Sequence, residues 1–225
     1  MLITGNLYER RPTKLTYVSN NSVTSTNTTY TFSAQSLGSM VDRRWILVGA
    51  CGGQSSGSKS ITGITIDGSA MSQIFSDVTT AGQDPVALFA LQWPTGTTGD
   101  IAVTFNASMA RCAIVVYTMS TDFAPTTVFD DQVDKTLSGS DLSVTVNVPA
   151  LGAGLALGLS TLSAGSASAT WTGFTEDVDI GAGSTAQGLT GASLGVINQQ
   201  SVTTTVTFAG TLISNRCFLR TVTFR

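Results

Sequence analysis

The stretch DLSVTVNV, residues 141–148, alternates apolar and polar side chains without a break. Successive side chains of a strand point to opposite faces, so this pattern predicts a strand with one buried and one solvated face. The same alternation recurs in TYTFS (29–33), DIAVTF (100–105) and SVTTTVTF (201–208). No window of twelve or more residues keeps the apolar spacing of an amphipathic helix. The sequence therefore predicts an all-β protein.

Three further runs are apolar at consecutive positions: WILVGAC (45–51), VALFAL (86–91) and AIVVY (113–117). Such strands are expected at the centre of a sheet, covered on one face by the partner sheet and on the other by loops or neighbouring subunits. Turn residues such as DG (67–68) and PTGTTGD (94–100) separate the strands. Short strands divided by such turns predict a β-sandwich or jelly-roll-like fold.

The chain contains a weak internal echo. The triplet VTF at 103–105 is followed by Arg111-Cys112 and an apolar strand, and the VTF at 206–208 is followed by Arg216-Cys217. This recurrence indicates two related halves, which would cover residues 28–119 and 141–225. Chance recurrence in a threonine-rich β protein is the alternative.

The segment between the halves carries Val128, Phe129 and Val133 and does not resemble a free linker. We therefore expect the halves to pack together in a single β-sandwich domain, residues 13–225. Separate lobes are the other possibility.

Charged residues make up only 11% of the chain, and the formal net charge is −3. Neutral polar residues supply most of the polarity, which suits a protein packed against neighbours in an assembly. A secreted adhesin could have the same balance. Nucleic acid binding needs clustered lysine and arginine, so no nucleic acid partner is expected.

The cysteines Cys51, Cys112 and Cys217 have no CxxC spacing and lie in apolar runs. They are predicted to be free, buried thiols, as in proteins assembled in a reducing cytoplasm. The N-terminal residues do not resemble a signal peptide, and no apolar run approaches the ~20 residues of a membrane span. No membrane partner is expected.

Catalytic signatures are absent from the sequence. The chain has no histidine, which excludes Ser-His-Asp and Cys-His nucleophiles. Its only glutamates are Glu9 and Glu176, so a glycosidase would have to use aspartates. We interpret the protein as a non-enzyme with no catalytic residues, no metal site and no cofactor.

One segment could bind a sugar. Trp171 and Phe174 precede Asp177 and Asp179, which alternation would place on one strand face. Aromatic rings beside acids can line a glycan-binding groove or a weak calcium site. A charged edge strand that guards against edge-to-edge pairing is the alternative, and the acidic run at residues 130–134 allows the same two interpretations.

The first dozen residues, 1–12, are predicted to act as a docking arm. Gly5, Asn6 and Pro12 interrupt any regular element in this segment, yet it carries large apolar side chains. Such segments often become ordered against a partner, although a frayed terminus is the alternative. The residues expected to dock are Leu2, Ile3, Leu7 and Tyr8.

Read in order, three segments carry a family resemblance: DRRWILV (42–48), ITIDG (64–68) and LQWPTGTTGDIAVTF (91–105). They resemble β-sandwich virion structural proteins of tailed bacteriophages and phage-like particles. The resemblance covers most of residues 28–117 and, more weakly, the second half. It implies a capsid decoration, head-fibre or tail-associated protein and carries over no catalytic residues.

The resemblance also sets expectations about partners. The protein should dock on other virion proteins of the capsid or tail and self-associate, with a trimer as the default homo-oligomer. It would be assembled in the bacterial host cytoplasm and end in the virion. The alternative function is a carbohydrate- or receptor-binding module of a phage fibre or spike.

Overall fold

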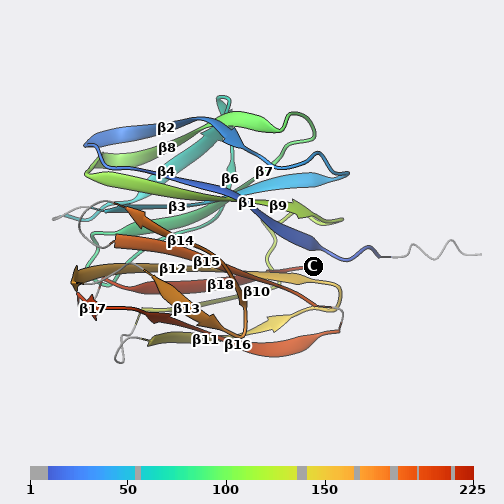
Figure 1. Ribbon diagram of the computed structural model, residues 1–225. Coiled ribbons are helices and arrows are strands. Elements are labelled where there is room, and N and C mark those ends of the chain that lie inside the picture. The colour runs from blue at the N-terminus through green and yellow to red at the C-terminus, as the bar shows by residue number, and fades with distance from the viewer. Residues whose placement is uncertain are drawn as a thin grey trace, which may run out of the picture.

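The computed structural model describes residues 10–53, 57–135, 141–164, 168–182, 187–196, 198–213 and 216–225. In these residues the chain forms strands and no helix, which confirms the predicted all-β, β-sandwich type of fold. Consequently no helix of the described chain could span a membrane. Four antiparallel sheets, here called A to D, stack as layers in the order B, A, C, D (Figure 1).

The first half of the chain forms sheets A and B. Sheet A has the strand order β1-β9-β3-β7-β6, and sheet B has the order β2-β8-β4-β5. The strands are β1 (Lys14–Val23), β2 (Asn27–Ser36), β3 (Arg44–Gly53), β4 (Ile61–Ile66), β5 (Ser69–Ala70), β6 (Ser72–Val78), β7 (Pro85–Gln92), β8 (Thr98–Met109) and β9 (Arg111–Ser120).

The second half forms sheets C and D. Sheet C has the order β10-β18-β12-β15-β14, with β17 paired to β12, and sheet D has the order β11-β16-β13. The strands are β10 (Asp130–Asp134), β11 (Asp141–Val148), β12 (Ala153–Ala164), β13 (Ala169–Thr172), β14 (Thr175–Ala182), β15 (Gln187–Gly195), β16 (Gln200–Phe208), β17 (Thr211–Leu212) and β18 (Phe218–Phe224).

Three hydrophobic cores separate the four layers. In β3, Ile46, Val48 and Ala50 enter the core shared with sheet B, whereas Leu47 and Cys51 enter the core shared with sheet C. Sheet A is thus buried on both faces, which is why β3, β7 and β9 are apolar at consecutive positions. These three strands are buried as predicted. Their second cover is the other half of the same chain.

The two halves share one topology. Replacing β1, β9, β3, β7 and β6 by β10, β18, β12, β15 and β14 converts the strand order of sheet A into that of sheet C. The same correspondence turns β2, β8 and β4 into β11, β16 and β13 of sheet D. The VTF triplet at 103–105 lies within β8, and the triplet at 206–208 ends its counterpart β16. Cys112 and Cys217 lie where the counterpart strands β9 and β18 begin.

The three cysteines are free and buried, as predicted. Burial raises the pKa of Cys51 to about 12 and that of Cys217 to about 11. Their thiols are therefore protonated near neutral pH and behave as small apolar side chains.

Candidate interaction surface

A fully buried carboxylate, that of Asp84, forms an ion pair between the two halves. The Asp84 carboxylate is fully buried and accepts hydrogen bonds from Arg216, with Nε–Oδ2 at 2.6 Å and Nη2–Oδ1 at 2.7 Å. Gln187 and Thr161 also donate to this carboxylate, each at 3.3 Å. Both carboxylate oxygens are thus engaged by donors of the second half. The pair joins sheets A and C and offers no free group for chemistry.

A second group of charges also joins the halves. Arg220 pairs with Asp131 through Nη2–Oδ2 at 2.5 Å and lies 3.4 Å from Asp77, which also pairs with Lys135. The guanidinium carbon of Arg220 stands 4.6 Å from the ring centre of Phe75. Arg220 donates hydrogen bonds to the Asp131 carboxylate, and these raise the pKa of Arg220 although burial acts in the opposite direction. These charges neutralise one another and connect β18 to β6 and β10.

The other aspartates of the acidic run on β10 cap an edge strand. Asp134 accepts a hydrogen bond from the Ser143 amide at 2.9 Å, and Asp130 accepts one from the Asn147 amide at 2.7 Å. Burial alone would raise the pKa of Asp130, but the hydrogen bonds led by that of Asn147 outweigh it and lower the pKa. Both amides belong to β11, at the edge of sheet D. The acids therefore block strand addition at this edge.

The aromatic residues predicted to bind a sugar lie in the core between sheets C and D. Trp171 is 8% exposed and donates its indole N–H to Thr190 at 2.8 Å, and Phe174 is 4% exposed. Sugar binding on aromatic rings needs an open ring face. Neither ring presents an open face, because both are packed between sheets C and D.

The two acids of this segment do not share a strand face, so that expectation was wrong. A β-bulge at 176–178 turns Asp177 toward sheet A, where it accepts a hydrogen bond from the Tyr117 hydroxyl at 3.1 Å. Asp179 instead accepts the Ala169 amide of sheet D at 2.8 Å. Within the described ranges, no three acidic or cysteine side chains gather closely enough to hold a metal ion.

A groove follows the segment 121–129, which connects β9 to β10. Three hollows of about 490, 260 and 420 Å³ lie along this segment. Phe123 lines both the first and the second hollow, and Phe129 lines both the second and the third, so the hollows are neighbours. We call them the connector groove. Arg10 lines its first hollow. The central hollow is lined by Phe123, Ala124, Thr127, Val128, Phe129 and Arg225.

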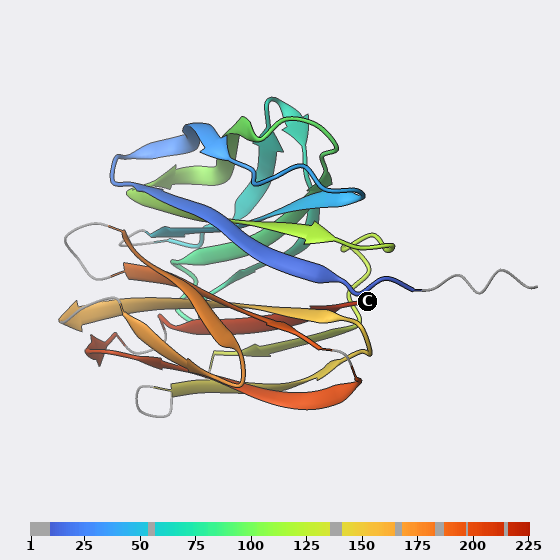
Figure 2. The same ribbon diagram turned by 45° about the vertical axis from the view of Figure 1, so that its right-hand side comes forward.

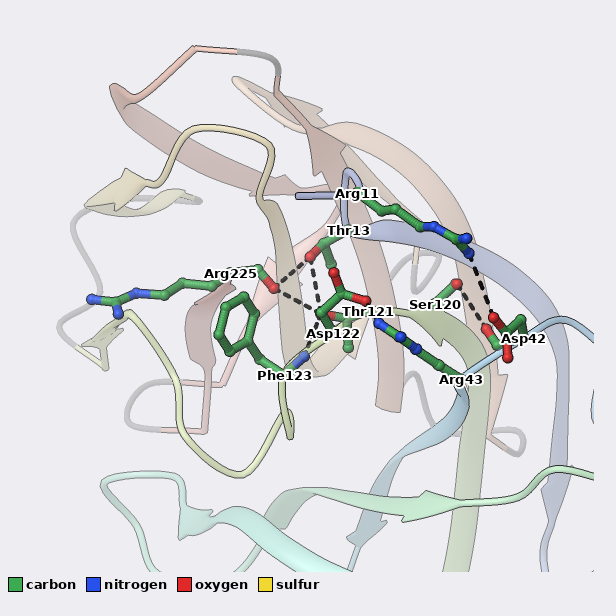
Figure 3. Close-up of polar contacts among 9 residues, drawn as sticks. All are labelled: Arg11, Thr13, Asp42, Arg43, Ser120, Thr121, Asp122, Phe123 and Arg225. Atoms are coloured by element: carbon green, nitrogen blue, oxygen red, sulfur yellow. Dashed lines mark hydrogen bonds and ion pairs between the residues drawn. The ribbon is translucent and has the colours of Figure 1, made fainter. Parts of the chain in front are cut away.

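Polar contacts between distant parts of the chain hold the groove in place (Figure 3). The buried hydroxyls of Thr13 and Thr121 lie 3.1 Å apart, and both donate to the main-chain oxygen of Arg225. The Phe123 amide donates to the Thr121 hydroxyl at 3.2 Å. Residues near the two ends of the described chain therefore fix the start of the connecting segment and the position of Phe123.

Arginines stack on both rings of the groove. The guanidinium carbon of Arg10 lies 5.3 Å from the ring centre of Phe123, and that of Arg225 lies 4.9 Å from the ring centre of Phe129. Arg43 pairs with Asp122 beside them. The Nε and Nη2 atoms of Arg10 are buried and have no hydrogen-bond partner in the described part of the chain. Arginine and aromatic residues are the types most enriched where proteins bind each other.

Large apolar side chains are exposed next to this groove. Met40 and Val41, in the loop 37–43, are 61% and 44% exposed, and Phe123 is 46% exposed. The Ser120 hydroxyl donates to the Asp42 main-chain oxygen at 3.0 Å, which holds this loop beside the end of β9 (Figure 3). We call the loop 37–43 together with the connector groove the end surface. Large apolar side chains exposed near one another in this way are typical of interaction sites.

The predicted docking residues Leu2, Ile3, Leu7 and Tyr8 lie outside the described residues. No sequence pattern singles out Phe123 or Arg225 as surface-forming residues. The signal that the sequence does carry is that Val128 and Phe129 make the connecting segment too apolar for a free linker.

Comparison with known proteins adds no assignment: the sequence matches no family model, and no curated protein is similar to it.

Proposed function

We propose that this protein is a non-enzymatic structural component of a tailed-phage virion, which docks on the particle and self-associates. The observation that carries the proposal is the end surface. Met40, Val41 and Phe123 are exposed there beside stacked arginines, whereas the apolar strands of the four sheets are covered within the chain. The capsid decoration, head-fibre and tail-associated roles all need such a docking surface.

The arrangement of charges supports a structural role. The acidic and basic side chains between the halves are engaged with one another, as Asp84 and Arg216 are, and stabilise the stack. Ion pairs that join the sheets in this way oppose local opening of the stack, which suits a particle component. Its neutral polar exterior lowers the cost of removing water when the protein packs against neighbours.

Particle binding is tested by purifying phage particles from cells that carry the gene and measuring the protein per particle. We expect a fixed stoichiometry that survives washing in moderate salt. The variant Met40→Ser/Val41→Ser should lower the bound amount at least tenfold, because it removes exposed apolar side chains of the docking surface. Val133→Ser is the matched control, since Val133 is 46% exposed on β10, outside the end surface.

Two results would contradict the proposal. The protein could be absent from washed particles, or it could be present in amounts that scale only with its concentration in the lysate. Catalytic turnover of any substrate by the purified chain would likewise reject the non-enzymatic assignment.

A further inference from the structure

The connector groove opens where the segment 10–13 leaves the body of the protein. Figure 2 shows the blue segment before β1 running outward beside the C-terminus, away from both sandwiches. Pro12 favours an extended conformation at the residue before it, so Arg11 does not turn the chain back toward its own body. The described chain thus begins at Arg10, beside the groove.

We infer that the connector groove binds residues 1–9 of a second copy of this chain. The inference rests on the proposed function and names the partner for its self-association. Each copy would give one arm and receive one, so that the copies are joined by repeated, equivalent contacts.

The chemistry of the groove fits that of the arm. Residues 1–9 read MLITGNLYE and supply large apolar side chains. The groove offers Phe123, Val128 and Phe129 along its length. A segment of this length spans at most about 30 Å when extended, which is long enough to follow several hollows.

The unpaired groups of the groove also fit. The buried Nε and Nη2 atoms of Arg10 lack acceptors among the described residues, and buried polar atoms are rarely left so. An extended segment brings main-chain carbonyl oxygens that can accept from them, and Glu9 adds a carboxylate. A second copy therefore supplies both apolar and polar complements to the groove.

Sedimentation of the purified full-length protein and its variants tests the inference. Wild type should sediment above its monomer mass of 23.3 kDa. Deletion of residues 1–9 and the substitution Phe123→Ser should each weaken self-association at least tenfold, because they remove the two sides of one contact. Val133→Ser, at the same 46% exposure as Phe123, should have no effect. Circular dichroism checks that every variant keeps its β structure.

Cross-linking between tagged copies identifies the occupant of the groove. Leu7→Cys on one copy and Thr127→Cys on a differently tagged copy should form a disulfide between copies under mild oxidation. The native cysteines do not interfere because all three are buried. A double variant that cross-links only within single chains at high dilution would show that the arm binds its own groove and would overturn the inference.

The remaining outcomes are also decisive. A monomeric wild type, or a deletion variant that still self-associates as wild type does, would reject arm exchange. Because these experiments use the purified chain without particles, they leave the virion proposal to be judged separately by its own stoichiometry. A protein that binds particles but does not exchange arms would retain the proposed function and lose this inference.

Discussion

Replacing Asp84 by asparagine should destabilise the protein far more than the same change at the surface. The substitution keeps the size of the side chain but removes its charge, so the Arg216 guanidinium, whose side chain is 17% exposed, loses the ion pair with Asp84. Gln187 and Thr161 cannot compensate for the lost negative charge, because both side chains are neutral hydrogen-bond donors.

The expected magnitude follows from this burial. Breaking a buried ion pair on one side costs about 3–5 kcal/mol, and the partial exposure of Arg216 places the cost near the lower end, about 3 kcal/mol. For a chain of this length, that corresponds to a fall in Tm of roughly 6–12 °C.

The control is Asp42→Asn. Asp42 pairs with Arg11 at 3.5 Å, and both side chains are more than 70% exposed (74% and 72%). Such surface pairs contribute about 0–1 kcal/mol, so the control should lower Tm by less than about 4 °C.

Calorimetry and urea unfolding followed by circular dichroism measure both variants. The double variant Asp84→Asn/Arg216→Gln should recover part of the loss, because it removes the positive charge that the Asp84 carboxylate balances. Equal shifts for Asp84→Asn and Asp42→Asn would refute the reasoning that the Asp84–Arg216 pair holds the two halves together.

Three further results are expected. Asp130→Ala should destabilise the protein at neutral pH but have little effect in acid. The folded state lowers the pKa of the Asp130 carboxyl, so this group stabilises the fold above its unfolded-state pKa, and the contribution is lost as the pH falls through its folded-state pKa. Urea unfolding at neutral and acid pH measures the difference. The thiols, with Cys51 at a pKa of about 12, should react with a thiol reagent only after denaturation, and labelling of the native protein would contradict their burial. Gly191→Ala should cost about 1–3 kcal/mol of stability, because an added methyl group would strike the Tyr117 hydroxyl. Unchanged urea unfolding would show that the interface between sheets A and C has room for a methyl group at this position.

Part of the candidate site could be inferred from the sequence. The apolar residues Val128 and Phe129 indicated that the connecting segment packs against the body, and it does so beside Arg225. The groove itself could not be predicted from the sequence, because it forms only where Arg10, Phe123 and Arg225 come together in space. These residues are brought together by hydrogen bonds between Thr13, Thr121 and the Arg225 main chain, over separations that no local pattern encodes.

The sugar-binding hypothesis shows the opposite limit. Spacing identified Trp171, Phe174 and two acids as a set, but a sequence pattern does not say which face of a strand is covered. Packing against sheet D buries both rings, and one β-bulge sends Asp177 and Asp179 to different neighbours. A single extra residue in a strand is enough to reverse the face on which the next side chains lie.

By itself, the sequence determined the strands and their burial. Alternation in 141–148 reflects one wet and one dry face, and the continuous apolar run 45–51 reflects a strand covered on both sides. Both patterns are local, because the side-chain direction of a strand reverses at every residue. Only the tertiary structure decided what covers sheet A, how Asp84 finds Arg216, and where an open groove remains. Those outcomes depend on contacts between residues far apart in the chain, and such contacts form only once the two sandwiches have packed together.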